Sequence, residues 1–185
     1  MKPVILHTRR LTLEVPTTAD VDTIAEYCTD PLFEQVLTTP WPYTREHALE
    51  FVTEFVPNGW RLGAEYVWAL RLRGTFLGIA SFRPPISEIG FWIGEAHRGN
   101  GYMTEAIDGI LDWVFANGTE EVTWQAIAGN LGSAAVARKT GFTYTGEYES
   151  SHAHRGGPAP AWHASIRASD SRDVKPGWPG ATRPA

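Results

Sequence analysis

The sequence is poor in cysteine. Cys28 is the only cysteine among 185 residues, which excludes an intrachain disulfide and a zinc site built from several cysteines. A chain without disulfides is typical of a reducing compartment, so we expect a cytoplasmic protein. No run of His, Cys and carboxylate side chains has the spacing of a metal site either, and we expect no metal cofactor.

The sequence also has fewer basic than acidic residues, and it has no long apolar run. Sixteen Lys and Arg residues stand against 21 Asp and Glu, giving a formal net charge of −5. A mildly acidic chain is unsuited to broad binding of nucleic-acid phosphates, so we expect no nucleic-acid partner. No apolar run approaches the roughly 20 residues of a membrane helix, and the short apolar run at the N-terminus does not resemble a signal peptide. We therefore expect no membrane partner.

Several common catalytic motifs are missing. The chain has no P-loop, no G-x-S-x-G serine elbow and no H-E-x-x-H zinc helix. The pair Gly99 and Gly101 lacks the third glycine of a dinucleotide fingerprint, and no opening βαβ unit precedes it. These absences argue against P-loop nucleotide hydrolysis, serine-elbow hydrolysis, zinc proteolysis and NAD-type redox chemistry.

What is present is an alternation of strand and helix patterns in the order β-α-α-β-β-β-α-β-α-β-β. This order predicts a mixed α/β domain, a twisted central mixed sheet flanked by helices, over residues 1–168. The second helix, which begins at Thr44, is expected to end at Pro57. Residues 169–185 lack an apolar period and are expected to form a loose, dispensable tail, with Trp178 as a candidate contact in a homodimer.

The most informative segment runs from Glu88 to Met103. A strand pattern leads into a turn with two close glycines, and the turn opens the longest amphipathic helix. Unpaired N–H groups at a helix start bind phosphates, and Arg98 could add a charged contact. An ordinary glycine loop between a strand and a helix is the alternative that the glycines alone leave open.

Three blocks of the sequence resemble the GNAT superfamily of acyl-CoA-dependent N-acetyltransferases, in its RimJ/RimL branch. Residues 98–103 are similar to the family's pyrophosphate motif Gln/Arg-x-x-Gly-x-Gly/Ala, with Met103 in the last position. Residues 130–133 and 139–142 resemble its second CoA block, and residues 9–13 resemble the opening strand of the branch. The resemblance covers roughly residues 7–167 and implies the GNAT fold.

The resemblance also implies a set of CoA contacts. The backbone of the strand before the turn would run beside the pantetheine arm, the turn would hold the pyrophosphate, and the second block would add polar contacts. The residues concerned are Phe91, Trp92, Ile93, Arg98, Gly99, Asn100, Gly101, Tyr102, Met103, Asn130, Ser133 and Lys139. Each also has a plain structural interpretation, as core strand, helix cap or helix-end charge.

The candidate catalytic groups are Ser133 and Glu88. Many family members carry a tyrosine acid where this chain has Ala137, so the resemblance points to Ser133 as the acid for the leaving thiolate. Glu88 is a candidate general base, and the three histidines near the end of the domain, among them His152, are weaker candidates. Loop aromatics are candidates for the wall of the acceptor site: Phe33, Trp41 and Tyr43.

The expected reaction is transfer of an acetyl or other short acyl group from acyl-CoA, the co-substrate, to a primary amine. A protein N-terminal α-amine is the acceptor type of the resembled branch. Two alternatives stay open at this stage: a small-amine or antibiotic acetyltransferase, and a non-catalytic acyl-CoA-binding regulatory module.

Overall fold

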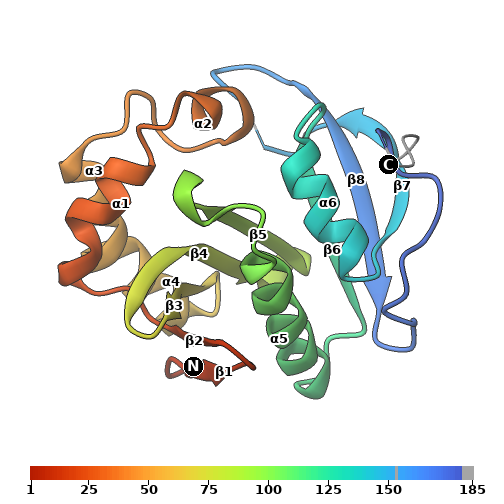
Figure 1. Ribbon diagram of the computed structural model, residues 1–185, viewed down its shortest axis with the longest axis horizontal. Coiled ribbons are helices and arrows are strands. Elements are labelled where there is room, and N and C mark those ends of the chain that lie inside the picture. Colours follow the sequence, from red (N-terminus) through yellow and green to blue (C-terminus); the bar gives the residue numbers. More distant parts are fainter. Residues whose placement is uncertain (153, 181–185) are drawn as a thin grey trace.

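A computed structural model describes residues 1–152 and 154–180. One eight-stranded sheet crosses the molecule in the order β1-β2-β3-β4-β5-β6-β8-β7 (Figure 1). The predicted mixed α/β domain with one central sheet is thereby confirmed. The strands are β1 (Leu6–His7), β2 (Leu11–Glu14), β3 (Tyr66–Leu72), β4 (Thr75–Arg83), β5 (Glu88–Ile93), β6 (Glu121–Ile127), β7 (Thr143–Glu149) and β8 (Pro160–Arg167).

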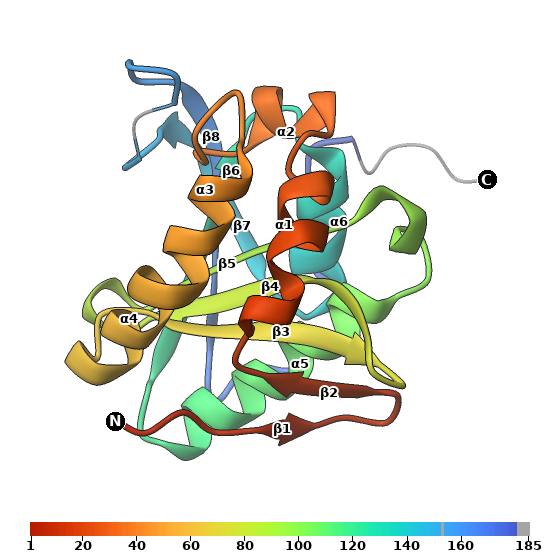
Figure 2. The ribbon, with the colours of Figure 1, turned by 90° about the vertical axis from the view of Figure 1, so that its left-hand side faces the viewer.

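Helices flank this sheet. α5 packs against β1, β2, β4, β5 and α6, and α4 packs against β3. The short strands β1 and β2 form the outer edge of the sheet beside α5 (Figure 2). No helix of the described ranges is long and apolar enough to cross a membrane. The helices are α1 (Val21–Tyr27), α2 (Pro31–Val36), α3 (Arg45–Glu50), α4 (Val56–Leu62), α5 (Tyr102–Ala116) and α6 (Leu131–Lys139).

The sheet opens between β5 and β6. These two strands are parallel, and their pairing consists of Glu88 with Thr123 and Ile89 with Trp124. Beyond that point β5 stays paired with β4 as far as Ile93, while β6 continues along β8. One edge of β5 is therefore left without a strand partner from Gly90 onward.

The prediction that Pro57 ends the second helix is wrong. The π-helical residues Phe51–Phe55 follow α3, and α4 begins at Val56 with Pro57 in its first turn. The chain stays helical through this junction, because Phe55 and Val56 keep right-handed helical dihedral angles, and Pro57 directly follows the wider π-helical turn. The helix ends instead at Gly63, in the left-handed conformation with φ +69°. α2 was also missed, since Pro31 both follows the end of α1 and begins a new helix.

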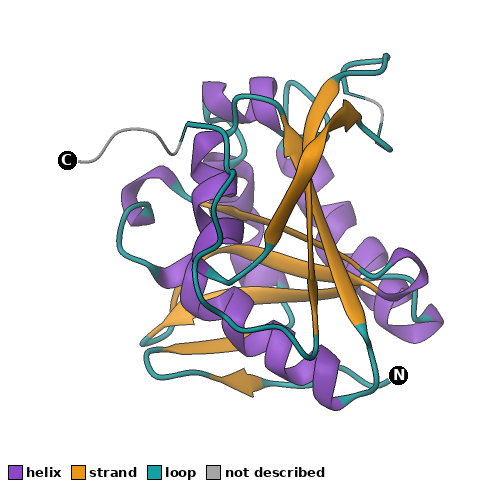
Figure 3. Ribbon diagram, turned by 90° about the vertical axis from the view of Figure 1, so that its right-hand side faces the viewer, coloured by secondary structure: helices purple, strands orange, loops and turns teal. Residues whose placement is uncertain are grey.

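The expectation of a loose tail does not hold for residues 169–180. Trp178 is 4% exposed and packs on Trp124 and Tyr144, each with ring centroids 5.6 Å away. Lys175 Nζ donates to Gly141 O at 2.7 Å, and Arg172 donates to Asp112 at 2.9 Å. Figure 3 shows this segment as a long loop that runs back along the domain after β8. It lacks an apolar period because it is neither helix nor strand. Residues 181–185 lie outside the described residues.

A buried ion pair anchors α1 to the sheet. Asp20 is 5% exposed and accepts two hydrogen bonds from Arg71 of β3, at 2.9 and 2.7 Å. Burial by itself would raise the pKa of Asp20, but the bonds from Arg71 and Thr17 outweigh it and hold that pKa below its ordinary value.

Acid should therefore weaken this pair. Because the folded-state pKa of Asp20 is lowered, its contribution is complete above the unfolded value of about 4 and is lost as the pH falls toward the folded value. We expect Asp20→Asn to cost about 2 kcal/mol of unfolding free energy at pH 7 and less at pH 3. Urea unfolding at both pH values measures this difference. An equal cost at both would contradict the assignment.

Candidate active site

A cavity of about 520 Å³ lies at the divergence of β5 and β6. Its floor is formed by β4, β5 and β6, its far end by the start of α6, and its other walls by the α2–α3 connection and the loop after β7. The side chains that line the cavity include Tyr43, Arg83, Glu88, Phe91, Trp124, Gln125, Asn130, Ser133 and His152. The cavity is large enough to accommodate a small acyl acceptor.

The backbone of β5 faces this opening. The N–H of Gly94 donates to Leu77 O of β4 at 2.9 Å. Since hydrogen bonding alternates along an antiparallel pair, Phe91 and Ile93 turn their N–H and C=O groups toward the unpaired edge. An amide-containing chain laid along that edge would find strand-like partners there. Phe91 and Ile93 are therefore placed for the expected backbone contacts. The backbone N–H and C=O groups of Trp92 are directed to β4 instead.

The glycine turn at the start of α5 presents free backbone donors. Gly99 and Gly101 adopt φ values of +77° and +74°, which glycine reaches without strain. Within the described ranges, no hydrogen bond uses the N–H groups of Gly99, Asn100 or Gly101. Those groups and the positive end of the helix dipole suit a phosphate group. Met103 is 4% exposed, so its side chain is core and its size does not fill the turn.

Arg10, which directly precedes β2, contacts the glycine turn and the first residues of α5. Its Nη1 donates to Asn100 O at 3.1 Å, its guanidinium lies 4.6 Å from the Tyr102 ring centroid, and its Nε pairs with Glu105 at 2.5 Å. Thr8 adds a bond to Glu105 at 2.6 Å. The turn is thus held in shape by residues 90 positions away in the sequence, a support that the sequence motif did not reveal.

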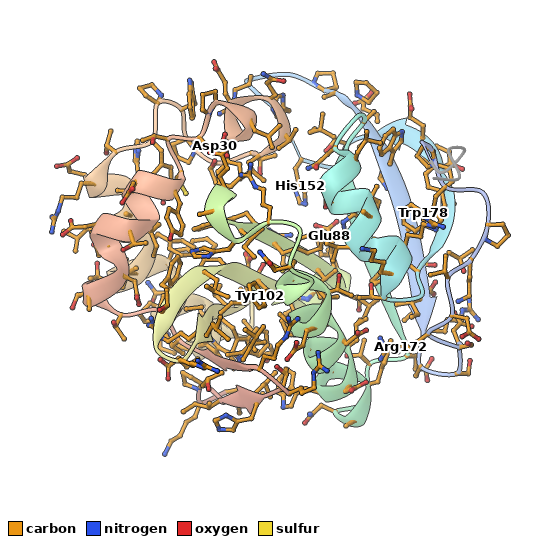
Figure 4. The ribbon with its side chains drawn as sticks, in the orientation of Figure 1. Asp30, Glu88, Tyr102, His152, Arg172 and Trp178 are labelled. Carbon is orange, nitrogen blue, oxygen red and sulfur yellow. The ribbon has the colours of Figure 1, made fainter. Side chains whose placement is uncertain are left out.

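Arg98 is placed differently from the expectation. Its guanidinium pairs with Asp30, the N-cap of α2, and its Nε donates to Ile93 O at 3.4 Å. Figure 4 shows Asp30 near the turn that follows β5. In this structure Arg98 therefore ties α2 to the end of β5, and Asp30 offsets the positive charge that the motif position would offer to a phosphate.

Ser133 lies at the start of α6 and lines the cavity. Its backbone N–H donates to Asn130 Oδ1 at 3.1 Å, so Asn130 is the N-cap of the helix. Its hydroxyl oxygen accepts from Trp124 Nε1 at 3.1 Å. Because the oxygen already accepts, the hydroxyl hydrogen is available to donate into the cavity.

Lys139 is not part of this cavity. It lies at the C-terminal end of α6 and lines a second hollow of about 490 Å³ together with Arg9, Arg10 and Gly101. The hollow thus brings Arg9 and Lys139 to the side of the glycine turn, while the carboxylates of Glu105, Asp108 and Asp112 line it as well and Arg10 is paired with the first of them.

The candidate wall residues separate into core and cavity positions. Phe33 is 4% exposed and packs edge-on against Trp92 at 5.7 Å, so it is core. Trp41 lies outside the cavity lining, with the Arg155 guanidinium 6.0 Å from its ring. Tyr43 alone of the three lines the cavity, and burial raises the pKa of its phenol.

Glu88 is at the centre of a polar cluster that the sequence did not predict. Its side chain is 7% exposed, and Oε1 accepts from Arg83 Nη1 and from His152 Nε2, both at 2.8 Å. Oε2 accepts from Gln125 Nε2. Both oxygens are occupied, so Glu88 is poorly placed to take a proton from an amine directly. The four side chains come from β4, β5, β6 and the loop after β7.

Known proteins share the sequence pattern and the fold of this chain. The family model of the acetyltransferase (GNAT) domain matches residues 10–143. The solved structure of Mycobacterium smegmatis RimJ in complex with CoA-disulfide is similar over 91% of this chain and 90% of that one, with a TM-score of 0.79 and 17% identity. RimL, a ribosomal alpha-N-protein acetyltransferase in complex with coenzyme A, is similar over 89% and 98%, with a TM-score of 0.78 and 19% identity.

A third structure is not named for a ribosomal protein. The Microcin C7 self immunity acetyltransferase MccE, in complex with acetyl-CoA and AMP, is similar over 86% of this chain and 93% of that one, with a TM-score of 0.75 and 19% identity. At these identities the likeness of the structures establishes the fold, while the domain match spans most of the chain. The chain belongs to the GNAT acetyltransferase family and is an acyl-CoA-dependent N-acyltransferase.

Proposed function

We propose that this chain transfers an acetyl group to the α-amine of a protein N-terminus. The observation that carries the proposal is the cavity that extends from the unpaired part of β5 to Ser133, with the donor-rich turn of α5 following β5 outside its lining. The RimL structure, similar over 89% of this chain, is named for activity on a protein N-terminus.

In this proposal acyl-CoA lies along β5 with its pyrophosphate at Gly99–Met103 and its thioester beside Ser133. The amine enters from the cavity and attacks the thioester carbon directly. Binding both reactants side by side supplies most of the rate, because the reaction becomes effectively intramolecular. A free N–H group of β5, turned to the open edge, polarises the carbonyl. The Ser133 hydroxyl donates to the departing sulfur.

A second candidate acceptor is a small amine. Arg155 in the loop after β7 donates to three backbone carbonyls of the α2 region, those of Phe33, Glu34 and Thr39, at 3.2, 3.0 and 2.6 Å. These bonds tie the loop after β7 to the α2–α3 connection, and both segments line the cavity, so a fixed boundary on this side favours a compact acceptor. The similar MccE structure is named for self immunity to Microcin C7 and not for a ribosomal protein.

A panel of acceptors tests the proposal. CoA release should be measured with acetyl-CoA and N-terminal peptides of varied first residue, their Nα-blocked counterparts, and small polyamines. Turnover with free but not with blocked peptides is the expected result. Turnover with small amines alone would favour the second candidate. Acyl-CoA binding without turnover on any amine would instead indicate a regulatory binding module.

Ser133→Ala should lower kcat by about 10- to 100-fold, the lower range of general acid catalysis. The KM for acyl-CoA should stay nearly constant, since the bond forms chiefly in the transition state. Trp124 Nε1 loses its acceptor, so the melting temperature must be measured alongside. Ser169→Ala, at an exposed serine outside the cavity, is the control. An unchanged kcat with a raised KM would mean that Ser133 only binds.

A further inference from the structure

We infer that His152 accepts the proton of the attacking amine and that Glu88 positions it. The inference rests on the proposed function, because it concerns the same cavity and the same acyl transfer. It replaces the expectation that Glu88 is itself the base. The observation behind it is the pairing of a buried carboxylate with a half-exposed imidazole on the cavity wall.

The contacts of Glu88 fix its charge state and its role. It accepts hydrogen bonds from Arg83, Gln125 and His152, and a carboxylate that accepts from a guanidinium is ionised. Arg83 is itself shared with Glu65 at 3.2 Å. Both carboxylate oxygens are therefore engaged by donors, so Glu88 is placed to hold the imidazole in position and not to take the proton of the acceptor itself.

The same contacts assign the tautomer of His152. Because ionised Glu88 can only accept, the Nε2 atom that faces it at 2.8 Å carries a hydrogen. In the neutral ring the lone pair is then on Nδ1, and no hydrogen bond of the described residues involves that atom. The side chain is 37% exposed against 7% for Glu88, so the imidazole, not the carboxylate, is open to the cavity. An imidazole is also the side chain that exchanges protons near neutral pH.

Hydrogen bonds of Gln125 hold the loop that carries His152 close to Glu88. Gln125 of β6 donates to Glu88 and accepts from the backbone N–H of Ser151 at 3.0 Å and the Ser150 hydroxyl at 3.2 Å. The N–H of His152 donates to Ser150 Oγ at 3.1 Å. In Figure 4 His152 and Glu88 lie together between β5 and α6, in the region where β5 leaves β6. Gln125 thus couples the position of the imidazole to the sheet.

The proton balance of the proposed step is complete. An acceptor arriving as an ammonium ion gives one proton to Nδ1 of His152, and the Nε2–H bond to Glu88 stabilises the resulting imidazolium. The amine nitrogen forms its bond to the thioester carbon and loses a second proton as the carbon–sulfur bond breaks. This second proton passes through solvent to Ser133 and restores the hydroxyl hydrogen that Ser133 gives to the sulfur. The thiolate takes up one proton through Ser133. One proton in total is released to solvent from His152 for each amide formed.

The test combines two substitutions with added imidazole. His152→Ala should lower kcat by about 100-fold with little change in the KM for acyl-CoA, and added imidazole should restore a substantial part of kcat. Glu88→Gln should lower kcat by about tenfold, without rescue, because the imidazole is still present but less well oriented. His154→Ala, on the same loop but outside the cavity lining, is the matched control and should leave kcat unchanged.

The alternatives give different results. Wild-type kcat in His152→Ala, or a loss that imidazole does not restore, overturns the inference. Complete loss in Glu88→Gln with near-normal His152→Ala would make Glu88 the base. If His152→Ala does not fold, His152→Gln is used, and it should show the same drop in kcat. If the wild-type chain acylates no amine, the proposed function fails instead, so the two failures are distinguishable.

Discussion

Gly101→Val is expected to reduce acyl-CoA affinity by at least about 100-fold, equivalent to roughly 2.7 kcal/mol, while the domain stays folded. Gly101 has a φ of +74°, a conformation that a β-branched residue rarely adopts. An added Cβ would meet nothing closer than Arg10 Nη2 at 3.6 Å, so the protein itself has room for it. The side chain would instead occupy the space beside the free N–H groups, where a phosphate oxygen must approach.

A matched control separates backbone strain from ligand exclusion. Gly74 in the β3–β4 hairpin has a φ of +86° and also has open space around its Cβ position. Gly74→Val should therefore lose comparable stability but keep its acyl-CoA affinity. Calorimetric titration and melting temperatures on both variants provide the comparison. Equal losses of affinity, or an unchanged affinity in folded Gly101→Val, would show that the turn does not hold the pyrophosphate.

The parts of the site that the sequence could predict are those coded locally. Gly99 and Gly101, between β5 and α5, are two positions apart in the chain and specify a sharp turn without help from distant segments. The alternation in β5 and the apolar stripe of α5 are likewise short-range patterns. Asn130 and Ser133 are three residues apart, a spacing that suits an N-cap residue and the backbone N–H that it accepts from.

The parts that could not be predicted depend on contacts between distant segments. Asp30 pairs with Arg98 across 68 positions, and His152 reaches Glu88 across 64. Neither pair has a spacing signal, because tertiary structure alone brings the partners together. Arg98 is an example. Its position in the motif predicted a contact with phosphate, whereas in the structure its guanidinium forms an ion pair with Asp30. The docking of the C-terminal segment is a third such case.

The C-terminal segment, residues 169–180, is predicted to contribute strongly to stability through the side chain of Trp178. Trp178→Ala should lower the free energy of unfolding by about 3–5 kcal/mol, the usual cost of removing a buried aromatic ring. For a chain of this length that corresponds to a melting temperature lower by roughly 10 °C. Val174→Ala, at a side chain 50% exposed in the same segment, should have little effect.

A conservative variant identifies the source of that stability. Within the described residues, Trp178 Nε1 is buried without a hydrogen-bond partner, so Trp178→Phe removes no bond and should cost much less than the alanine variant. Trp178 also packs on Trp124, whose indole N–H donates to Ser133. Truncation after Ala168 should therefore lower both the melting temperature and kcat, since the residue that orients the proposed acid loses its packing partner. A truncated protein with unchanged melting temperature would show that the segment only rests on the domain surface.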